Sequence, residues 1–223
     1  MKLYCHPIST TSRPVLLFIA ETGAPVEVQL VDLLQGEHQG PEFAALNPNR
    51  LVPVLEDGDF RLTECSAILK YLADKLNSPL YPKDLKARAR VNERMDWFNT
   101  QLRRELNFGL VYPQVFPYHR RRSDEAQAAQ LELGRENSRR WLKVLNDHII
   151  GPNAFVCGDD LTIADMLGVS IVMPARVTGT DFAAYPNIRN WLGRMKMLPG
   201  FAPTYQAFEG LVQSCAGREM VSI

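Results

Sequence analysis

The chain has 223 residues, of which 46% are hydrophobic, enough for a substantial core. Its 25 basic residues balance 25 acidic ones, so the formal net charge is zero. This balance argues against a general nucleic-acid surface and gives no support for an anionic membrane partner. No apolar run approaches the roughly 20 residues of a membrane-spanning helix, and MKLYCHP lacks the apolar core of a secretory signal. We expect neither nucleic acid nor a membrane as partner.

The first part of the chain predicts alternating short strands and helices. MKLYC predicts a strand, and residues 14–20 predict a helix with a proline in its first turn and Gly23 as its stop. The next predicted elements are a β-branched strand at 26–31, a short helix PEFAAL, strands LVPVLED and FRLT joined by a DGD turn, and a helix at 64–76. This order predicts a four-stranded mixed sheet, with the first two strands parallel and the last two antiparallel.

Strand signals stop after residues 77–89, which contain two prolines and read as a linker. Helices are predicted at about 88–108 and 123–148, followed by shorter ones starting near Ile163, Ile188 and Phe201. Ser123 is a good helix cap, and Thr162 with Asp165 forms a capping box. We therefore expect an α/β domain over residues 1–79 and an all-α domain over residues 87–223.

The four cysteines, at positions 5, 65, 157 and 215, lie far apart, with no C-x-x-C and no histidine at ligand spacing. This pattern predicts no metal site and no disulfide framework, and it favours a reducing cytoplasm. The simplest interpretation of each cysteine is a small buried hydrophobic residue.

VPVL, at residues 52–55, places a proline at the entry of an internal strand, where it cannot donate a ladder hydrogen bond. A cis Val52-Pro53 bond would turn the N–H and C=O of Val52 outward, free to pair with an extended peptide. The alternative is a trans proline on an edge strand.

Glu64, Cys65 and Ser66 occupy the first turn of a predicted helix. Free N–H groups there would suit a carboxylate, and the Glu64 side chain would suit an ammonium group. A carboxylate and an ammonium on one carbon form an amino-acid head group. The alternative is an ordinary solvated helix start, where acidic residues are common.

In combination these features resemble the cytosolic glutathione transferases, over almost the whole chain. The closest resemblance is to the theta- and delta-like branch, which includes bacterial members. The stretches that carry it are HPISTTSR, LLQGEHQGPEFAALNPNRLVPVLED, LTECSAI and GDDLTIADM. The resemblance implies a thioredoxin-like N-terminal domain, an all-α C-terminal domain, a cytoplasmic homodimer, and glutathione as co-substrate without a metal.

The resemblance also implies the site residues. Ser9 matches the serine that donates a hydrogen bond to the glutathione sulfur, with Thr10 and Ser12 as rival donors and Thr11 and Ser12 as candidate helix caps. Cys5 lies in the first strand, and Ser9 and Ser12 stand where redox relatives have thiols, which argues against disulfide exchange. The implied glutathione contacts are Val52 before Pro53 for the cysteinyl backbone, Glu64 for the γ-glutamyl ammonium, Cys65 or Ser66 for the γ-glutamyl carboxylate, and His38 and Arg50 for the glycyl end.

Cys65 departs from the serine usual in the family. A thiol donates more weakly than a hydroxyl, so we expect weakened glutathione binding and a lower KM for Cys65→Ser. The alternative places Cys65 in the core and gives the contact to Ser66.

Phe108, Tyr112 and Phe116 are candidates for the apolar pocket of a hydrophobic electrophile, because the first two share a helix face. The alternative is that they are core or dimer contacts. The expected activity is conjugation of the glutathione thiolate to an electrophilic carbon. A glutathione-dependent dehalogenase or isomerase, or a non-catalytic binding or dimerisation module, are the alternatives.

Overall fold

The computed structural model describes residues 1–223. The first part alternates strands and helices in the predicted order. Its elements are β1 (Lys2–Cys5), α1 (Arg13–Thr22), β2 (Glu27–Leu30), the short 3-10 helix η1 (Glu37–Gln39), α2 (Pro41–Leu46), β3 (Val54–Asp57), β4 (Phe60–Leu62) and α3 (Cys65–Lys75).

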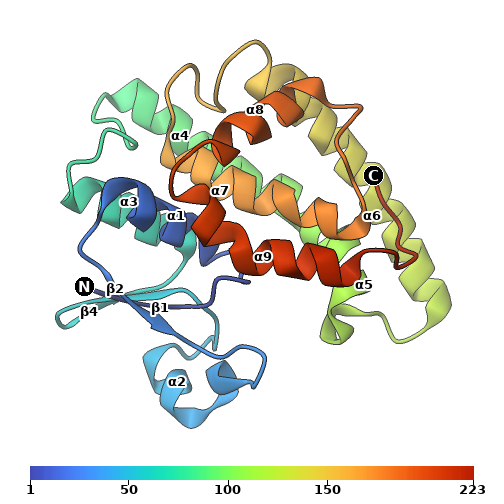
Figure 1. Ribbon diagram of the computed structural model, residues 1–223, viewed down its shortest axis with the longest axis horizontal. Helices are drawn as coiled ribbons and strands as arrows, with labels where there is room; N and C mark the ends of the chain where they lie inside the picture. Colours follow the sequence, from blue (N-terminus) through green and yellow to red (C-terminus); the bar gives the residue numbers. More distant parts are fainter.

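These strands form one mixed sheet in the order β2-β1-β3-β4. β1 pairs in parallel with β2, while β1 with β3 and β3 with β4 are antiparallel, as predicted. Because strand side chains alternate between faces, Leu3 and Leu55 join the main core with α1 and α3, whereas Val54 packs with Phe43 of α2 on the opposite face. Figure 1 shows α2 separated by the sheet from α1 and α3.

The rest of the chain is helical. Its elements are α4 (Leu85–Trp97), the π-helical segment η2 (Phe98–Val111), α5 (Tyr112–Val115), η3 (Pro117–His119), α6 (Asp124–Val144), the π-helical segment η4 (Leu145–Ile150), α7 (Ile163–Val172), η5 (Met173–Thr178), α8 (Pro186–Lys196) and α9 (Phe201–Cys215). No helix is both long enough and apolar enough to cross a membrane.

The helix predicted at about 88–108 runs longer in both directions, from Leu85 through η2 to Val115. It starts earlier because the Asp84 side chain accepts the N–H groups of residues 86 and 87. It ends at Phe116, which is extended, as expected for a residue that precedes a proline. The wide turns of η2 lead into Pro113, which has no N–H to donate.

The predicted caps are present. Ser123 Oγ accepts the N–H of Ala126 at the start of α6. At the start of α7 the carboxylate of Asp165 accepts the N–H and the hydroxyl of Thr162, at 2.9 and 3.0 Å. It also accepts the N–H of Val156 and the indole N–H of Trp191. This buried carboxylate therefore joins α7, α8 and the preceding loop.

One hydrophobic core of 44 buried residues runs through both parts of the chain. α1 and α3 from the sheet part pack against α7, and α1 also packs against α9 (Figure 1). The segment read as a linker is anchored, since Tyr81 is buried and the Leu80 carbonyl accepts the N–H of Ile163.

Two glycine contacts set the helix packing. A Cβ on Gly134 of α6 would lie 2.5 Å from the Gly109 carbonyl oxygen of η2, so these backbones touch directly. A Cβ on Gly168 of α7 would lie 2.4 Å from the ring of Phe98. Each glycine is present because no side chain fits there.

Candidate active site

The loop between β1 and α1 is built around Ser9. The N–H of Ser9 donates to the His6 carbonyl at 3.0 Å, and the Ser9 carbonyl accepts the N–H of Arg13. The Ser9 Oγ accepts the N–H of Ser12 at 3.3 Å. Burial lowers the pKa of His6, so its Nδ1 is available to accept the N–H of Ile8. His6 thus shapes the loop that holds Ser9.

Thr11 and Ser12 do not cap α1, contrary to the expectation. The Thr11 hydroxyl donates to the Val52 carbonyl at 2.9 Å, and it lies 3.1 Å from the Ser9 hydroxyl. Ser12 is fully buried, and its Oγ accepts the N–H of His6. Ser9 itself accepts the N–H groups of Ser12 and Arg13, through its hydroxyl and its carbonyl respectively.

The peptide bond between Val52 and Pro53 is cis, as proposed from VPVL. The Val52 N–H has no backbone partner, but its carbonyl already accepts the Thr11 hydroxyl. The expectation that both groups are free therefore holds for the N–H and is wrong for the carbonyl. The segment that would pair with a ligand backbone is tied directly to the Ser9 loop.

Glu64 stands just before α3, not inside its first turn as predicted. Its φ of 64° lies in the left-handed region, where a residue with a Cβ is strained. The N–H groups of Cys65, Ser66 and Ala67 have no backbone partner. An exposed carboxylate thus stands beside a helix N-terminus that offers free donors.

The Cys65 side chain lies in the core and is only 3% exposed. Burial raises the pKa of its thiol to about 11. The predicted contact from this thiol to a ligand carboxylate is therefore not available, because the side chain packs away from solvent. Ser66 is partly exposed and accepts the Asn99 Nδ2 at 2.8 Å.

Two residues of η2 near this helix start were not predicted. Asn99 donates to Ser66, and the positive charge of Arg103 offsets part of the rise that burial causes in the pKa of the Cys65 thiol. Arg103 also keeps a buried Nε without a partner. Their spacing of four residues on one helix was a readable signal of a shared face, but nothing in the sequence placed that face beside residue 65.

His38 and Arg50 lie in the connection between β2 and β3. His38 is partly buried in η1 with an unpartnered Nδ1, and Arg50 is exposed with a φ of 54°. No hydrogen bond joins either of them to Ser9 or Glu64. Their assignment to the glycyl end of glutathione remains a prediction.

The other thiols are remote from this chemistry. Cys5 is buried in β1, where burial raises its pKa to about 12, and Cys215 is buried in α9. Cys157 is partly exposed, unlike the buried position expected. No group of three or more histidine, cysteine or acidic side chains is arranged to hold a metal ion.

The predicted pocket aromatics form one cluster. The rings of Phe108 and Tyr112 are 5.1 Å apart, those of Tyr112 and Phe116 are 5.4 Å apart, and His119 stacks on Tyr112. The Tyr112 hydroxyl donates to Thr10 Oγ1 at 2.8 Å. This aromatic wall therefore touches the residue next to Ser9, although Phe108 remains 41% exposed.

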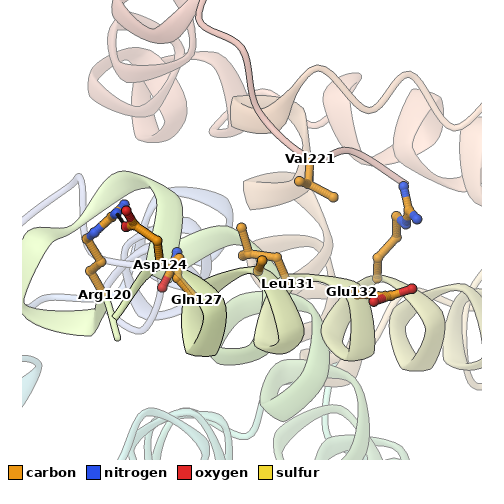
Figure 2. A pocket seen from close by; sticks show the side chains of 8 residues that line it. Arg120, Asp124, Gln127, Leu131, Glu132 and Val221 are labelled. Atoms are coloured by element: carbon orange, nitrogen blue, oxygen red, sulfur yellow. Dashed lines mark hydrogen bonds and ion pairs between the residues drawn. The ribbon is translucent and has the colours of Figure 1, made fainter. Parts of the chain in front are cut away.

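A separate hollow of about 330 Å³ lies between the first turns of α6 and the C-terminal segment. Figure 2 shows its wall of Arg120, Asp124, Gln127, Leu131 and Glu132, with Val221 opposite. None of the predicted site residues lines it. The candidate site is therefore defined by the Ser9 loop with Val52 and Thr10-bound Tyr112, together with the start of α3.

The sheet, the cis proline and the all-helical second part define a glutathione-transferase type of protein. The family model for the N-terminal domain of glutathione S-transferase matches residues 1–74. Human glutathione S-transferase theta-1 is 33% identical over 217 residues, covering 96% of this chain and 90% of that protein.

Solved structures agree. Human glutathione transferase theta-2 in complex with glutathione and an unknown ligand is 31% identical, with a TM-score of 0.85, covering 99% of this chain and 92% of that one. A human theta-class enzyme in complex with the glutathione conjugate of 1-menaphthyl sulfate is 32% identical, with a TM-score of 0.81, covering 96% and 90%. The chain belongs to the glutathione S-transferase family, and the predicted resemblance is confirmed.

Proposed function

We propose that the protein conjugates glutathione to a hydrophobic electrophile, with the sulfur held beside Ser9. The glutathione thiolate attacks an electrophilic carbon, the new S–C bond forms, and the leaving group departs with the electrons of the broken bond. The observation that carries this proposal is the hydrogen bond that ties the Ser9 loop to Val52 before the cis Pro53, and it is supported by the free N–H groups at the start of α3.

Ser9 is strong enough for this role. Lowering a thiol pKa from about 8.5 by about 2 units requires about 2.7 kcal/mol. A hydrogen bond to a charged group contributes about 1.5–3 kcal/mol, and the N-terminus of α1 adds up to about 1 kcal/mol. Ser9 acts as a donor that keeps its proton, so it needs no neighbouring base.

We assign the other groups of glutathione to residues of the same site. Val52 pairs with the cysteinyl backbone beside Pro53, and Glu64 binds the γ-glutamyl ammonium. The γ-glutamyl carboxylate is held by the free N–H groups at the start of α3 and by Ser66, while Cys65 contributes only its backbone. His38 and Arg50 serve the glycyl end.

The electrophile rests on the aromatic wall formed by Phe108, Tyr112 and Phe116, which presents apolar rings next to the Ser9 loop. Dehalogenation would use the same thiolate attack with halide as the leaving group. A non-catalytic module would need neither a serine at this site nor a strained acidic residue at the start of α3, so conjugation is preferred.

The two parts divide this work. Residues 1–79 form the glutathione-binding unit and residues 87–223 carry the electrophile wall. The human theta-class relatives support a cytoplasmic enzyme, and we place the working state as a homodimer.

The test of Ser9 is a conjugation assay with a reactive aryl halide. Ser9→Ala should lower kcat/KM by about 10- to 100-fold, because one hydrogen bond to the thiolate is lost. The pKa of the bound thiol should rise in parallel, measured by the ultraviolet absorbance of the thiolate.

Ser214→Ala is the matched control, because Ser214 donates only to the Leu211 carbonyl at the end of α9. It should behave as wild type. A Ser9→Ala enzyme with unchanged kcat/KM and thiol pKa would overturn the assignment, and no retention on immobilised glutathione by wild type would favour the non-catalytic module.

A further inference from the structure

Hydrogen bonds link three oxygens in a row: Ser9 Oγ, Thr11 Oγ1 and the Val52 carbonyl oxygen. The Ser9 and Thr11 oxygens are 3.1 Å apart, and Thr11 donates to Val52 at 2.9 Å. Ser9 and Thr11 are each partly exposed, so a ligand can reach this row.

The directions of these hydrogen bonds are set by counting hydrogens. A hydroxyl carries one hydrogen, and Thr11 gives its hydrogen to the Val52 carbonyl. The bond between Thr11 and Ser9 therefore uses the hydrogen of Ser9. Without a ligand, the hydrogen that a bound thiolate needs is directed to Thr11.

We propose that Thr11 is a positioning residue that aims the Ser9 hydrogen when glutathione binds, an inference that rests on the proposed function of this site. The cysteinyl N–H of glutathione replaces the Thr11 hydroxyl as the donor to the Val52 carbonyl. The Thr11 hydroxyl then rotates and donates to Ser9 Oγ, which leaves the Ser9 hydrogen for the sulfur. Only two O–H bonds rotate, and no covalent bond changes.

The rotated arrangement makes Ser9 a better donor. Its oxygen then accepts two hydrogen bonds, from the N–H of Ser12 and from Thr11. Hydrogen bonds in a chain polarise one another, so an oxygen that accepts more donates more strongly. Binding of the peptide backbone at Val52 is thereby coupled to stabilisation of the thiolate at Ser9.

The neighbouring hydroxyls do not offer this link. Thr10 is engaged by Tyr112, and Ser12 is fully buried and accepts the N–H of His6. Thr11 alone among these three contacts both Ser9 and Val52.

The test compares Thr11→Val, which keeps the shape without the hydroxyl, with Thr11→Ser, which restores it. Thr11→Val should raise the pKa of the bound thiol by about half a unit to one unit and lower kcat/KM about three- to tenfold. The KM for glutathione should change less than about twofold. Thr11→Ser should recover the wild-type pKa. Thr22→Val, which removes a hydroxyl-to-carbonyl bond at the far end of α1, is the matched control.

A double variant distinguishes an effect of Thr11 that acts through the Ser9 hydroxyl from a purely structural effect. If Thr11 acts through Ser9, Thr11→Val should have no further effect on the thiol pKa in a Ser9→Ala background. An effect that persists there, or a Thr11→Val thiol pKa that is unchanged or lower, would overturn the proposal. An unchanged thiol pKa in Ser9→Ala alone would instead overturn the proposed role of Ser9.

Discussion

Glu64 has a strained backbone conformation, and its side chain stands at the N-terminus of α3. Its left-handed φ costs about 1–3 kcal/mol in a residue with a Cβ, and its side chain makes no hydrogen bond within the chain. The conformation holds an exposed carboxylate at the free N-terminus of α3. Strain retained without an internal partner supports the proposed contact between Glu64 and a ligand.

Glu64→Gly tests the backbone strain and the proposed binding role of Glu64 separately. Glycine adopts the left-handed conformation freely, so the free energy of unfolding should be unchanged or higher by up to about 1 kcal/mol. The KM for glutathione should rise at least about tenfold, because an ion pair to the ammonium is lost. Urea denaturation and steady-state kinetics measure the two effects.

Glu64→Gln serves as the control that keeps the strain. It should retain wild-type stability and show the same direction of change in KM. A Glu64→Gly protein that binds glutathione as wild type would remove Glu64 from the site.

Chemistry at single residues was only partly readable from the sequence. The motif LTECSAI identified the helix start, but it did not reveal that the Cys65 thiol points into the core, since that depends on how α3 packs. The sequence identified Ser9 as the donor but treated Thr11 only as a candidate cap, because the Val52 carbonyl that Thr11 contacts is 41 residues away.

Among the elements, α7 has the strongest local determinant. Asp165 is fully buried, and burial raises its pKa to about 6, so burying its charge is costly. Four donors from Thr162, Val156 and Trp191 offset that cost. The capping box predicted from the sequence is thus also a junction between helices.

Asp165→Ala should lower the free energy of unfolding by about 3–5 kcal/mol, because it leaves buried N–H groups unpaired. Asp165→Asn, which preserves the volume, should cost less but still at least about 1 kcal/mol. The midpoint of urea unfolding measures both, with an unchanged m value.

Asp160→Ala is the control from the same loop, since Asp160 is exposed and makes no hydrogen bond. It should change stability by less than about 0.5 kcal/mol. If Asp165→Ala also lowered the free energy of unfolding by less than about 0.5 kcal/mol, the hydrogen bonds of Asp165 would contribute little to stability.

Element order and type were predictable because they follow from local periodicity and turn residues. The long helix through η2 was the exception. Past residue 108 it packs against α6 at Gly109 and Gly134, a contact that a local pattern does not report.

At the scale of the whole molecule, the sheet part and the helical part share one core. α1 and α3 pack against α7, so the main core of the sheet part is continuous with that of the helical part. The sequence predicted two domains because strand signals stop after the proline-containing segment 77–89, and the burial of Tyr81 and the Leu80 contact show that this segment is packed.

The shared core predicts a single unfolding transition. The three tryptophans, at positions 97, 141 and 191, all lie in the helical part. Cys5 and Cys65 lie in the sheet part, and burial raises their pKa values to about 12 and 11, so they react with thiol reagents only on unfolding. Tryptophan fluorescence and thiol labelling should give the same urea midpoint.

The measurement uses a Cys157→Ser and Cys215→Ala variant, so that labelling reports on the sheet part alone. Labelling at a clearly lower urea concentration than the fluorescence change would mean that the sheet part unfolds by itself. The shared core would then be a weak interface.

The close backbone contact between Gly109 and Gly134 limits how the substrate preference of this enzyme can be altered. The aromatic wall is carried by a helix whose backbone is pressed against α6, with no space for even one methyl group. In directed evolution, the shape of the proposed electrophile site will therefore change by exchanging side chains at positions such as Phe108 and Phe116. Libraries that vary Gly134 will mostly yield unfolded protein, while libraries at the ring positions will yield folded enzymes with new preferences.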